Sequence, residues 1–192
     1  MIFSEIVKKN RSYRVYYEDK VIPADTLVEF VDNARLIPSS MNLQLSKYYI
    51  VDYNKRHIVF PHLKWAAYLA DWDGPKEGER PAAYIIILSD QNISSNVKFD
   101  HAIAAQTILL SAVEKDMGGC IIGTIINKEG LAQSLKIPDN CTIELVVALG
   151  FPKEKVILKE INPGDDIKYY RDSEGNHYVP KRKLTDIIIS NK

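Results

Sequence analysis

The sequence predicts a single domain that contains both helices and strands and carries a C-terminal arm, and three observations support this fold class. Helical patterns with one apolar face alternate with short apolar runs that are typical of buried strands. A length of 192 residues fits a single domain spanning the whole chain, since domains average about 150 residues. Beyond residue 151 apolar residues become sparse, so we expect residues 152–192 to form an arm lying on another surface rather than a second domain.

In the first half of the chain, the elements follow from hydrophobic periodicity and breaker residues. After a short N-terminal helix, Pro23 opens a helical stretch whose apolar residues recur every three or four positions. This helix must end before Pro38, because proline disfavours helix at the residue that precedes it. The remaining predicted elements are a strand at 48–51, a helix at 55–70, a charged loop at 71–81 and a central strand at 82–88.

The second half of the chain continues the alternation. Its longest helical pattern covers residues 98–117, and we expect Gly118 and Gly119 to end that helix in left-handed backbone conformation. Asn127 is a candidate N-cap for a small helix. The other predicted elements are a short strand or tight loop at 120–124 and a strand at 143–149.

Composition excludes several classes of partner. The 25 Lys and Arg residues balance the 25 Asp and Glu residues, which argues against duplex DNA and anionic membranes, since both attract basic proteins. The apolar run at 82–88 is far shorter than the roughly 18 residues needed to cross a bilayer. The N-terminus carries its charges after its apolar residues, unlike a signal peptide. We therefore expect a cytoplasmic protein without nucleic-acid or membrane partners.

Familiar catalytic motifs are missing from the sequence. It contains no Gly-rich phosphate loop, no Gly-x-Ser-x-Gly elbow and no cysteine spacing suited to a metal. Cys120 is a candidate nucleophile, but a small apolar thiol beside isoleucines is more often a core residue. The chemistry that remains is chemistry supplied by a cofactor.

Three short segments combine residue types suited to an anionic or polar ligand. Residues 10–14 place two arginines and a serine at the end of a short helix, and a guanidinium is a planar, permanently charged donor for phosphate. Residues 38–44 are dense in small hydrogen-bonding side chains, and residues 181–183 are all basic. Each segment alone also fits a plainer alternative, namely a solvated cluster, a turn or a polar tail.

Taken in order, these segments resemble the motifs of the nitroreductase family of flavoenzymes. The family's basic-Arg-Ser-x-Arg motif is matched by Arg11, Ser12 and Arg14. Asn10 stands where members often carry a second basic residue, which removes one cation from the expected phosphate site. The motif Ala-Arg-x-x-Pro-Ser-x-x-Asn-x-Gln is closely matched by residues 34–44.

The resemblance continues to the end of the chain. A long helix leads to a Gly-rich step at residues 118–123, and the motif Ala-Leu-Gly-x-Pro is matched by residues 148–152. A basic residue, Arg182, precedes the last apolar segment, as it does in the family. Two features depart from the pattern. Leu45 and Ser46 replace the usual Pro-Trp, and the region that shapes the family's substrate pocket is short.

The resemblance implies an α+β protein with a three-layer α-β-α fold, in which helices cover both faces of a central mixed, mostly antiparallel sheet. It implies that FMN binds at the interface of an intertwined homodimer, with the arm packed on the partner subunit and the 38–42 loop contributed by the other subunit. The implied cofactor-binding residues are Arg11, Ser12, Arg14, Pro38, Ser39, Ser40, Asn42, Ile122, Gly123, Lys181 and Arg182.

The resemblance also implies roles for these residues. Arg11, with Lys181 or Arg182 from the arm, would hold the FMN phosphate. Arg14 would stabilise the negative charge that reduction places around flavin N1 and the C2 carbonyl. Backbone groups around residue 122 would face N5, and no side chain need act as an obligate acid or base.

The implied reaction is a ping-pong transfer of electrons from NADH or NADPH to an electron-poor small molecule, such as a nitroaromatic or a quinone. Other flavin chemistries on the same scaffold stay open, among them reductive dehalogenation, flavin breakdown and oxidation of a ring precursor. A non-catalytic flavin-binding protein is a further alternative.

Overall fold

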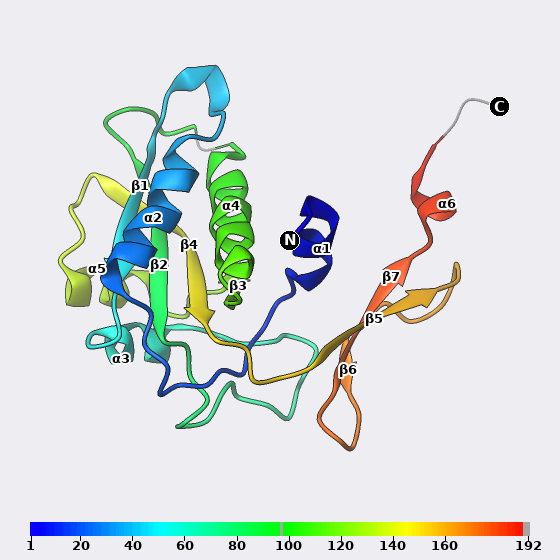
Figure 1. Cartoon of the computed structure of the whole chain (residues 1–192). Coiled ribbons are helices and arrows are strands. Elements are labelled where there is room, and N and C mark those ends of the chain that lie inside the picture. Colours follow the sequence, from blue (N-terminus) through cyan, green and yellow to red (C-terminus); the bar gives the residue numbers. More distant parts are fainter. Residues whose placement is uncertain (97, 190–192) are drawn as a thin grey trace.

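The centre of the fold is a four-stranded antiparallel sheet with strand order β1-β2-β4-β3. The structure is a computed structural model that describes residues 1–96 and 98–189 (Figure 1). Its strands are β1 (Ser46–Val51), β2 (Ala83–Asp90), β3 (Gly118–Ile122) and β4 (Cys141–Gly150). The apolar run that predicts a central strand is confirmed, because β2 pairs with β1 on one side and β4 on the other.

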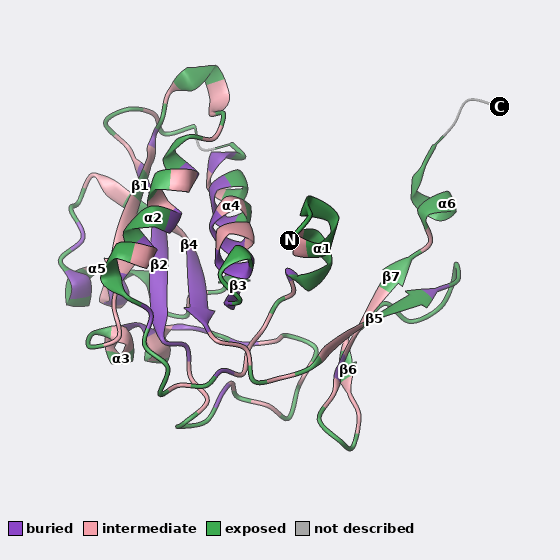
Figure 2. Cartoon of the chain, in the orientation of Figure 1, coloured by how far each residue is buried: buried purple, intermediate pink, exposed green. Residues whose placement is uncertain are grey.

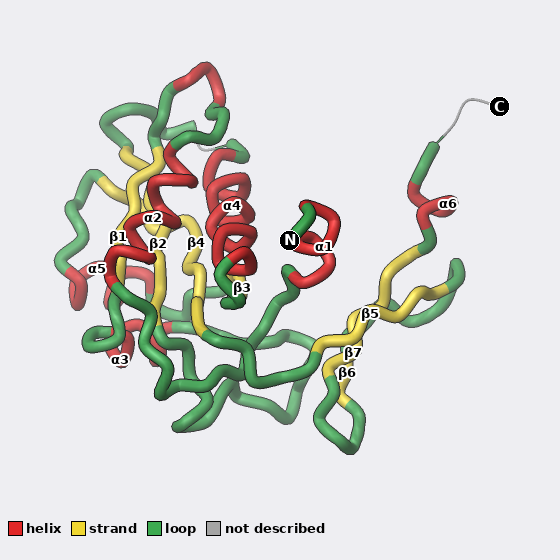
Figure 3. The backbone as a smooth tube through the Cα atoms, in the orientation of Figure 1, coloured by secondary structure: helices red, strands yellow, loops and turns green. Residues whose placement is uncertain are grey.

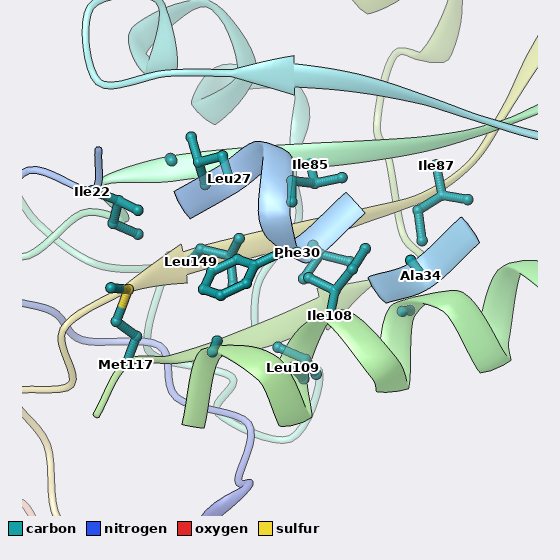
Figure 4. Packing of buried hydrophobic residues seen from close by; sticks show 14 of the residues in the cluster. Ile22, Leu27, Phe30, Ala34, Ile85, Ile87, Ile108, Leu109, Met117 and Leu149 are labelled. Carbon is teal, nitrogen blue, oxygen red and sulfur yellow. The ribbon is translucent and has the colours of Figure 1, made fainter. Parts of the chain in front are cut away.

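Helices cover both faces of this sheet. On one face, α2 (Ala24–Arg35) and α4 (Asp100–Glu114) pack against β2 and β4 in a cluster that includes Phe30, Ile85 and Ile108 (Figure 4). On the other face, a second cluster joins Ile86 to α3 (Arg56–Val59) and α5 (Lys128–Leu135). Successive residues of β2 thus enter opposite clusters, as strand geometry requires, and β2 and β4 are buried throughout most of their length (Figure 2). The three-layer α+β fold is confirmed.

The helix predicted at residues 55–70 is wrong beyond its first turns. After α3 the chain forms only a 3-10 turn, η2 (Phe60–His62), and then extends at Leu63. Pro61 lacks the backbone N–H that would continue a helical ladder, and Ala66 takes a left-handed φ of 40°. Residues 63–73 therefore form an irregular loop, which lines a cavity described below.

The prediction for Gly118 and Gly119 is also wrong, because these glycines do not end a helix in left-handed conformation. That role falls to Asp116, with φ 56°, and both glycines lie within β3. Their lack of a side chain serves close packing instead. A Cβ atom on Gly119 would lie 2.2 Å from the carbonyl oxygen of Ala148 in the neighbouring strand. The predicted N-cap is confirmed, since Asn127 Oδ1 accepts a hydrogen bond of 2.8 Å from Gly130 N.

Beyond β4 the chain leaves the three layers and builds a second, smaller sheet (Figures 1 and 3). In it β5 (Val156–Ile161) pairs parallel to β7 (His177–Arg182), and β6 (Tyr170–Arg171) pairs antiparallel to β7. The short helix α6 (Leu184–Ile187) follows. At the other end of the chain, α1 (Phe3–Lys9) packs beside α4. In the described part of the chain, no helix is long and apolar enough to cross a membrane.

Candidate functional site

A cavity of about 290 Å³ opens where the segment after α1, the middle of α4 and the arm meet. The arm contributes Tyr169 and three residues of β7, while α4 contributes Gln106 and Leu109. The full lining is Asn10, Arg11, Ser12, Arg14, Gln106, Leu109, Ile121, Tyr169, His177, Val179 and Lys181. Residues far apart in the sequence thus meet at one site.

Residues 10–14, called the arginine segment below, reach this cavity by running along the edge of β3. Ser12 forms a parallel bridge with Gly119, and Tyr13 N donates to Gly119 O at 3.0 Å. The Tyr13 ring lies over Gly118, where a Cβ atom would come within 2.5 Å of it. The two glycines at the start of β3 therefore allow the arginine segment to dock closely against the sheet.

Alternate residues of β7, a strand of the arm, face the cavity. Side chains two apart on β7 point to the same face, and His177, Val179 and Lys181 all line the cavity. Arg182 is one residue further along, so its side chain belongs to the opposite face. Of the two basic residues predicted to reach the phosphate, the structure brings only Lys181 to the lining of this cavity.

The cavity is cationic. Arg11, Arg14 and Lys181 line it, and no carboxylate is among its lining residues. Desolvation lowers the pKa of Arg11, whose Nη2 donates to Val7 O at 2.9 Å while its buried Nε has no hydrogen-bond partner. A desolvated guanidinium with an unused donor suits an anionic ligand, which would supply both the missing charge and the missing acceptor.

The backbone of Arg14 is held by a buried carboxylate from the start of the arm. Glu154 accepts hydrogen bonds from the N–H groups of Arg14 and Val15, and its other oxygen pairs with Arg171 at 3.0 Å. The Arg14 side chain turns the other way. Its Nη1 donates to Ser12 O at 3.2 Å, and its guanidinium carbon lies 5.0 Å from the centre of the Tyr169 ring.

Two further cavities lie near the first. A space of about 140 Å³ shares Arg14, Ile121 and Tyr169 with it and is bordered by Ile122 and Gly123. The second space shares residues 64–67 with a third of about 610 Å³. The third is lined mainly by apolar side chains of the loop that follows η2, which are Leu63, Trp65, Ala66, Ala67, Leu69, Ala70 and Trp72. The three spaces are therefore neighbours, each sharing wall residues with the next.

Cys120 borders the second space but does not fit the role of a nucleophile. Its side chain is buried, and burial raises the pKa of its thiol. A protonated, desolvated thiol is a poor nucleophile, because the thiolate is the reactive form. The structure favours the core position that the sequence left as the alternative.

The predicted residues of the 38–42 loop lie elsewhere in the same chain. This loop, with the 3-10 turn η1 (Ser40–Asn42), is fixed to the first turn of α4 because Ser40 N donates to the buried Asp100 carboxylate at 3.0 Å. Ser39 lines a separate cavity of about 150 Å³ with Asp100, while Pro38 and Asn42 are exposed. Within one chain, the structure therefore divides the predicted residues into two groups, one at the start of α4 and one beside its middle and β3.

Sequence reasoning missed His177, Tyr169 and Gln106 as lining residues. A signal existed for His177, because it lies four residues before Lys181 and strand periodicity puts the two on one face. Tyr169 lies in an irregular segment before β6, where no periodicity applies. Gln106 lies within the helix predicted at 98–117, but its place in the cavity wall beside the arm depends on tertiary structure.

His177 should make the stability of the protein depend on pH. Burial, followed by the nearby charges of Arg14 and Arg171, lowers the pKa of His177 to about 4 from its ordinary value of 6.5. The unfolded chain therefore binds more protons between these values, and stability should fall as the pH drops from 6.5 towards 4, by at most about 1.4 kcal/mol per pH unit. Urea unfolding at several pH values measures this slope.

Two variants test whether His177 causes this pH dependence of stability: His177→Gln, and His57→Gln as its control. The first should flatten the dependence between pH 4 and 6.5, because it removes the buried ring. The second replaces an exposed histidine and should follow the wild type. Parallel slopes for the wild type and His177→Gln would show that His177 is not held neutral in the folded chain.

Comparison with known proteins places this geometry in a family. The model of the nitroreductase family matches residues 7–151. A nitroreductase family protein from Clostridium novyi NT is 25% identical, with 80% of this chain and 88% of that chain covered and a TM-score of 0.64. An FMN-dependent nitroreductase from Clostridium difficile R20291 is 21% identical, with 97% and 98% covered and a TM-score of 0.67.

A third structure, from Desulfovibrio desulfuricans, is described as a nitroreductase in complex with FMN. It is 19% identical, with 98% of this chain and 96% of that chain covered, and its TM-score is 0.67. No curated protein sequence matches the chain.

Proposed function

The chain belongs to the nitroreductase family, and from this membership we propose that it is an FMN-dependent oxidoreductase that passes electrons from NADH or NADPH to an electron-poor small molecule. The observation that carries the proposal is the cationic cavity beside β3, which is linked by shared wall residues, through a smaller space, to a larger and mainly apolar one. Relatives of the same fold are described as FMN-dependent or FMN-bound, which supports the cofactor.

The residues present fit FMN. Its phosphate carries nearly two negative charges, and Arg11 and Lys181 are cations in a cavity lined by no carboxylate. The buried Nε of Arg11 has no partner in the chain and would donate to a phosphate oxygen. Ser12 adds a hydroxyl beside these cations, for the phosphate or the ribityl chain. These three residues are therefore proposed to hold the phosphate end of the cofactor.

Arg14 and the end of β3 are proposed to contact the flavin ring. When bound, FMN supplies hydride chemistry, which none of the chain's own residues can perform. Arg14 would offer a cation to the negative charge that reduction places around N1 and the C2 carbonyl. Gly123 has open space beside it, since a Cβ atom there would meet only Leu145 at 3.7 Å. The backbone at Ile122 and Gly123 can therefore approach N5 closely.

The cavity of about 610 Å³ is proposed to admit the electron donor and the acceptor in turn. Two tryptophans, Trp65 and Trp72, offer aromatic surfaces that suit a planar acceptor such as a quinone or a nitroaromatic. Because both molecules would use the same space, the oxidised donor must leave before the acceptor enters. A shared space of this kind supports a ping-pong cycle.

The site is proposed to be completed by a second copy of the chain. No residue of the 38–42 loop lines the cationic cavity of the same chain, and the resemblance assigns this loop to the partner's flavin. The arm, residues 152–192 of a single domain, would pack on that partner. Apolar residues exposed on both ends of the single chain support this arrangement, namely Ile2, Phe3, Leu184 and Ile187.

The experiment that tests the function uses the purified protein loaded with FMN under anaerobic conditions. NADH or NADPH should bleach the visible absorbance of the oxidised flavin, and a quinone should then restore it. Steady-state rates at several quinone concentrations should give parallel double-reciprocal lines. Bound flavin that no nicotinamide reduces would contradict the proposal and favour a non-catalytic flavin-binding protein.

A further inference from the structure

His177 is buried in the wall of the cationic cavity, and none of the family motifs found in the sequence includes it. Its exposed fraction is 1%. One ring nitrogen, Nε2, lies 3.5 Å from Arg14 Nη1, and the other, Nδ1, has no hydrogen-bond partner. A buried imidazole against a guanidinium is an unusual pairing, because both groups are able to carry positive charge.

The pairing determines which nitrogen of His177 carries the proton. A guanidinium only donates hydrogen bonds and stays charged, so the nitrogen facing it must accept. In the neutral ring Nε2 is then unprotonated and the proton lies on Nδ1. Burial and the two neighbouring cations, Arg14 and Arg171, lower the pKa of His177 to about 4, so the ring is neutral near pH 7.

The carboxylate in this region is already engaged and does not neutralise Arg14. Glu154 binds Arg171 and the backbone N–H groups of Arg14 and Val15. Among the residues that the structure describes, no carboxylate oxygen lies within 4.0 Å of the Arg14 guanidinium. Arg14 therefore keeps its full charge for a ligand.

Tyr169 completes the surroundings of Arg14. Its ring centre lies 5.0 Å from the guanidinium carbon and 5.3 Å from the centre of the His177 ring. The Tyr169 hydroxyl accepts a hydrogen bond of 3.2 Å from Tyr68 N. This bond connects the arm to the loop that lines the cavity of about 610 Å³. An aromatic face attracts a cation without cancelling its charge.

We propose that His177 is a positioning residue, which accepts a hydrogen bond from Arg14 and, together with the Tyr169 ring, fixes the guanidinium towards the bound flavin. A neutral acceptor holds the cation in place and leaves its charge available, whereas a carboxylate in the same position would neutralise it. The proposal rests on the proposed function, because it assigns the held cation to reduced FMN. It extends that function by making the arm a determinant of the flavin's reduction potential.

Three substitutions at His177 test the proposal through the reduction potential of bound FMN. His177→Phe keeps an aromatic ring but removes the acceptor, and it should weaken binding of reduced FMN at least tenfold more than binding of oxidised FMN. For a two-electron couple, this tenfold difference lowers the potential by about 30 mV. His177→Gln places an amide oxygen near the position of Nε2. Its ratio of affinities for reduced and oxidised FMN should therefore stay within threefold of the wild-type ratio. His177→Asn reaches only the position of Nδ1 and should behave like His177→Phe.

The potential separates a positioning role from a purely structural one. Loss of packing alone would weaken oxidised and reduced FMN equally and leave the potential unchanged. Equal potentials for His177→Phe and the wild type would overturn the proposal, and so would a failure of His177→Gln to restore the potential in a folded protein.

A second measurement needs no flavin and keeps this proposal separate from the proposed function. Nitrogen-15 NMR of the FMN-free wild-type protein should show His177 with its proton on Nδ1 at pH 7 and should show it taking up a second proton only below about pH 5. A proton on Nε2, or protonation near pH 6.5, would overturn the positioning role even if FMN binds. Failure to bind FMN, with the expected NMR result, would instead contradict the proposed function alone.

Discussion

Replacing Gly119 by alanine is expected to destabilise the protein by about 3 kcal/mol or more. The added Cβ atom would lie 2.2 Å from the Ala148 carbonyl oxygen and 2.7 Å from Leu109 Cδ2. The oxygen belongs to the backbone of β4, so the clash cannot be relieved by turning a side chain. The strand would have to move away from β4, and the arginine segment that docks on Gly119 would move with it. Urea unfolding of the FMN-free protein measures the loss.

Gly123→Ala is the matched control, because it adds the same methyl group just past the end of the same strand. Its Cβ atom would meet only Leu145 Cδ2, at an ordinary contact distance of 3.7 Å. The unfolding midpoint of this variant should stay close to that of the wild type. A Gly119→Ala protein as stable as the control would contradict the close packing of β3 against β4.

Replacing Arg11 by alanine is expected to weaken FMN binding about 100-fold, which corresponds to about 2.7 kcal/mol. The variant removes a desolvated cation and the unpartnered donor that we propose for the phosphate. Lys181→Ala should also weaken the binding of FMN. Quenching of FMN fluorescence in an equilibrium titration measures both affinities.

Arg182→Ala is the control for these two variants, because Arg182 lies on the face of β7 opposite to Lys181. It removes a charge of the same sign one residue away and should change the affinity less than threefold. Binding of riboflavin, which has no phosphate, should be equally weak in the wild type and in Arg11→Ala. A loss of affinity for Arg182→Ala that equals the loss for Lys181→Ala would contradict the assignment of the phosphate to the cavity face.

Local patterns in the sequence predicted most of the fold. The uninterrupted apolar run at 82–88 identified the central strand, because a strand buried on both faces has apolar side chains at successive positions rather than at every second one. The helix predicted at 55–70 failed for two reasons: Pro61 is a helix breaker that the sequence already contains but the apolar spacing does not reflect, and the positive φ of Ala66 has no signal in the sequence. Gly118 and Gly119 were misassigned for a different reason, since their function depends on Ala148, a residue distant in sequence.

The sequence predicted those site residues that belong to motifs, but not those that reach the cavity only through tertiary contacts. The motif around Arg11 and Arg14 identified the cationic side of the cavity before any coordinates. The choice between Lys181 and Arg182 required the alternation of β7, which is known only once the strand is placed. The neutral state of His177 depends on burial and on two arginines from other segments, so no local pattern reveals it.

If the cationic cavity binds FMN through its phosphate, FMN must bind far more tightly than riboflavin, which lacks that group. FMN and riboflavin are titrated separately into the flavin-free wild-type protein. We expect one FMN per chain, bound at least about 100-fold more tightly than riboflavin, because the two ligands differ only in the group that Arg11 and Lys181 would hold. Equal affinities for the two flavins, or no binding of either, would contradict it.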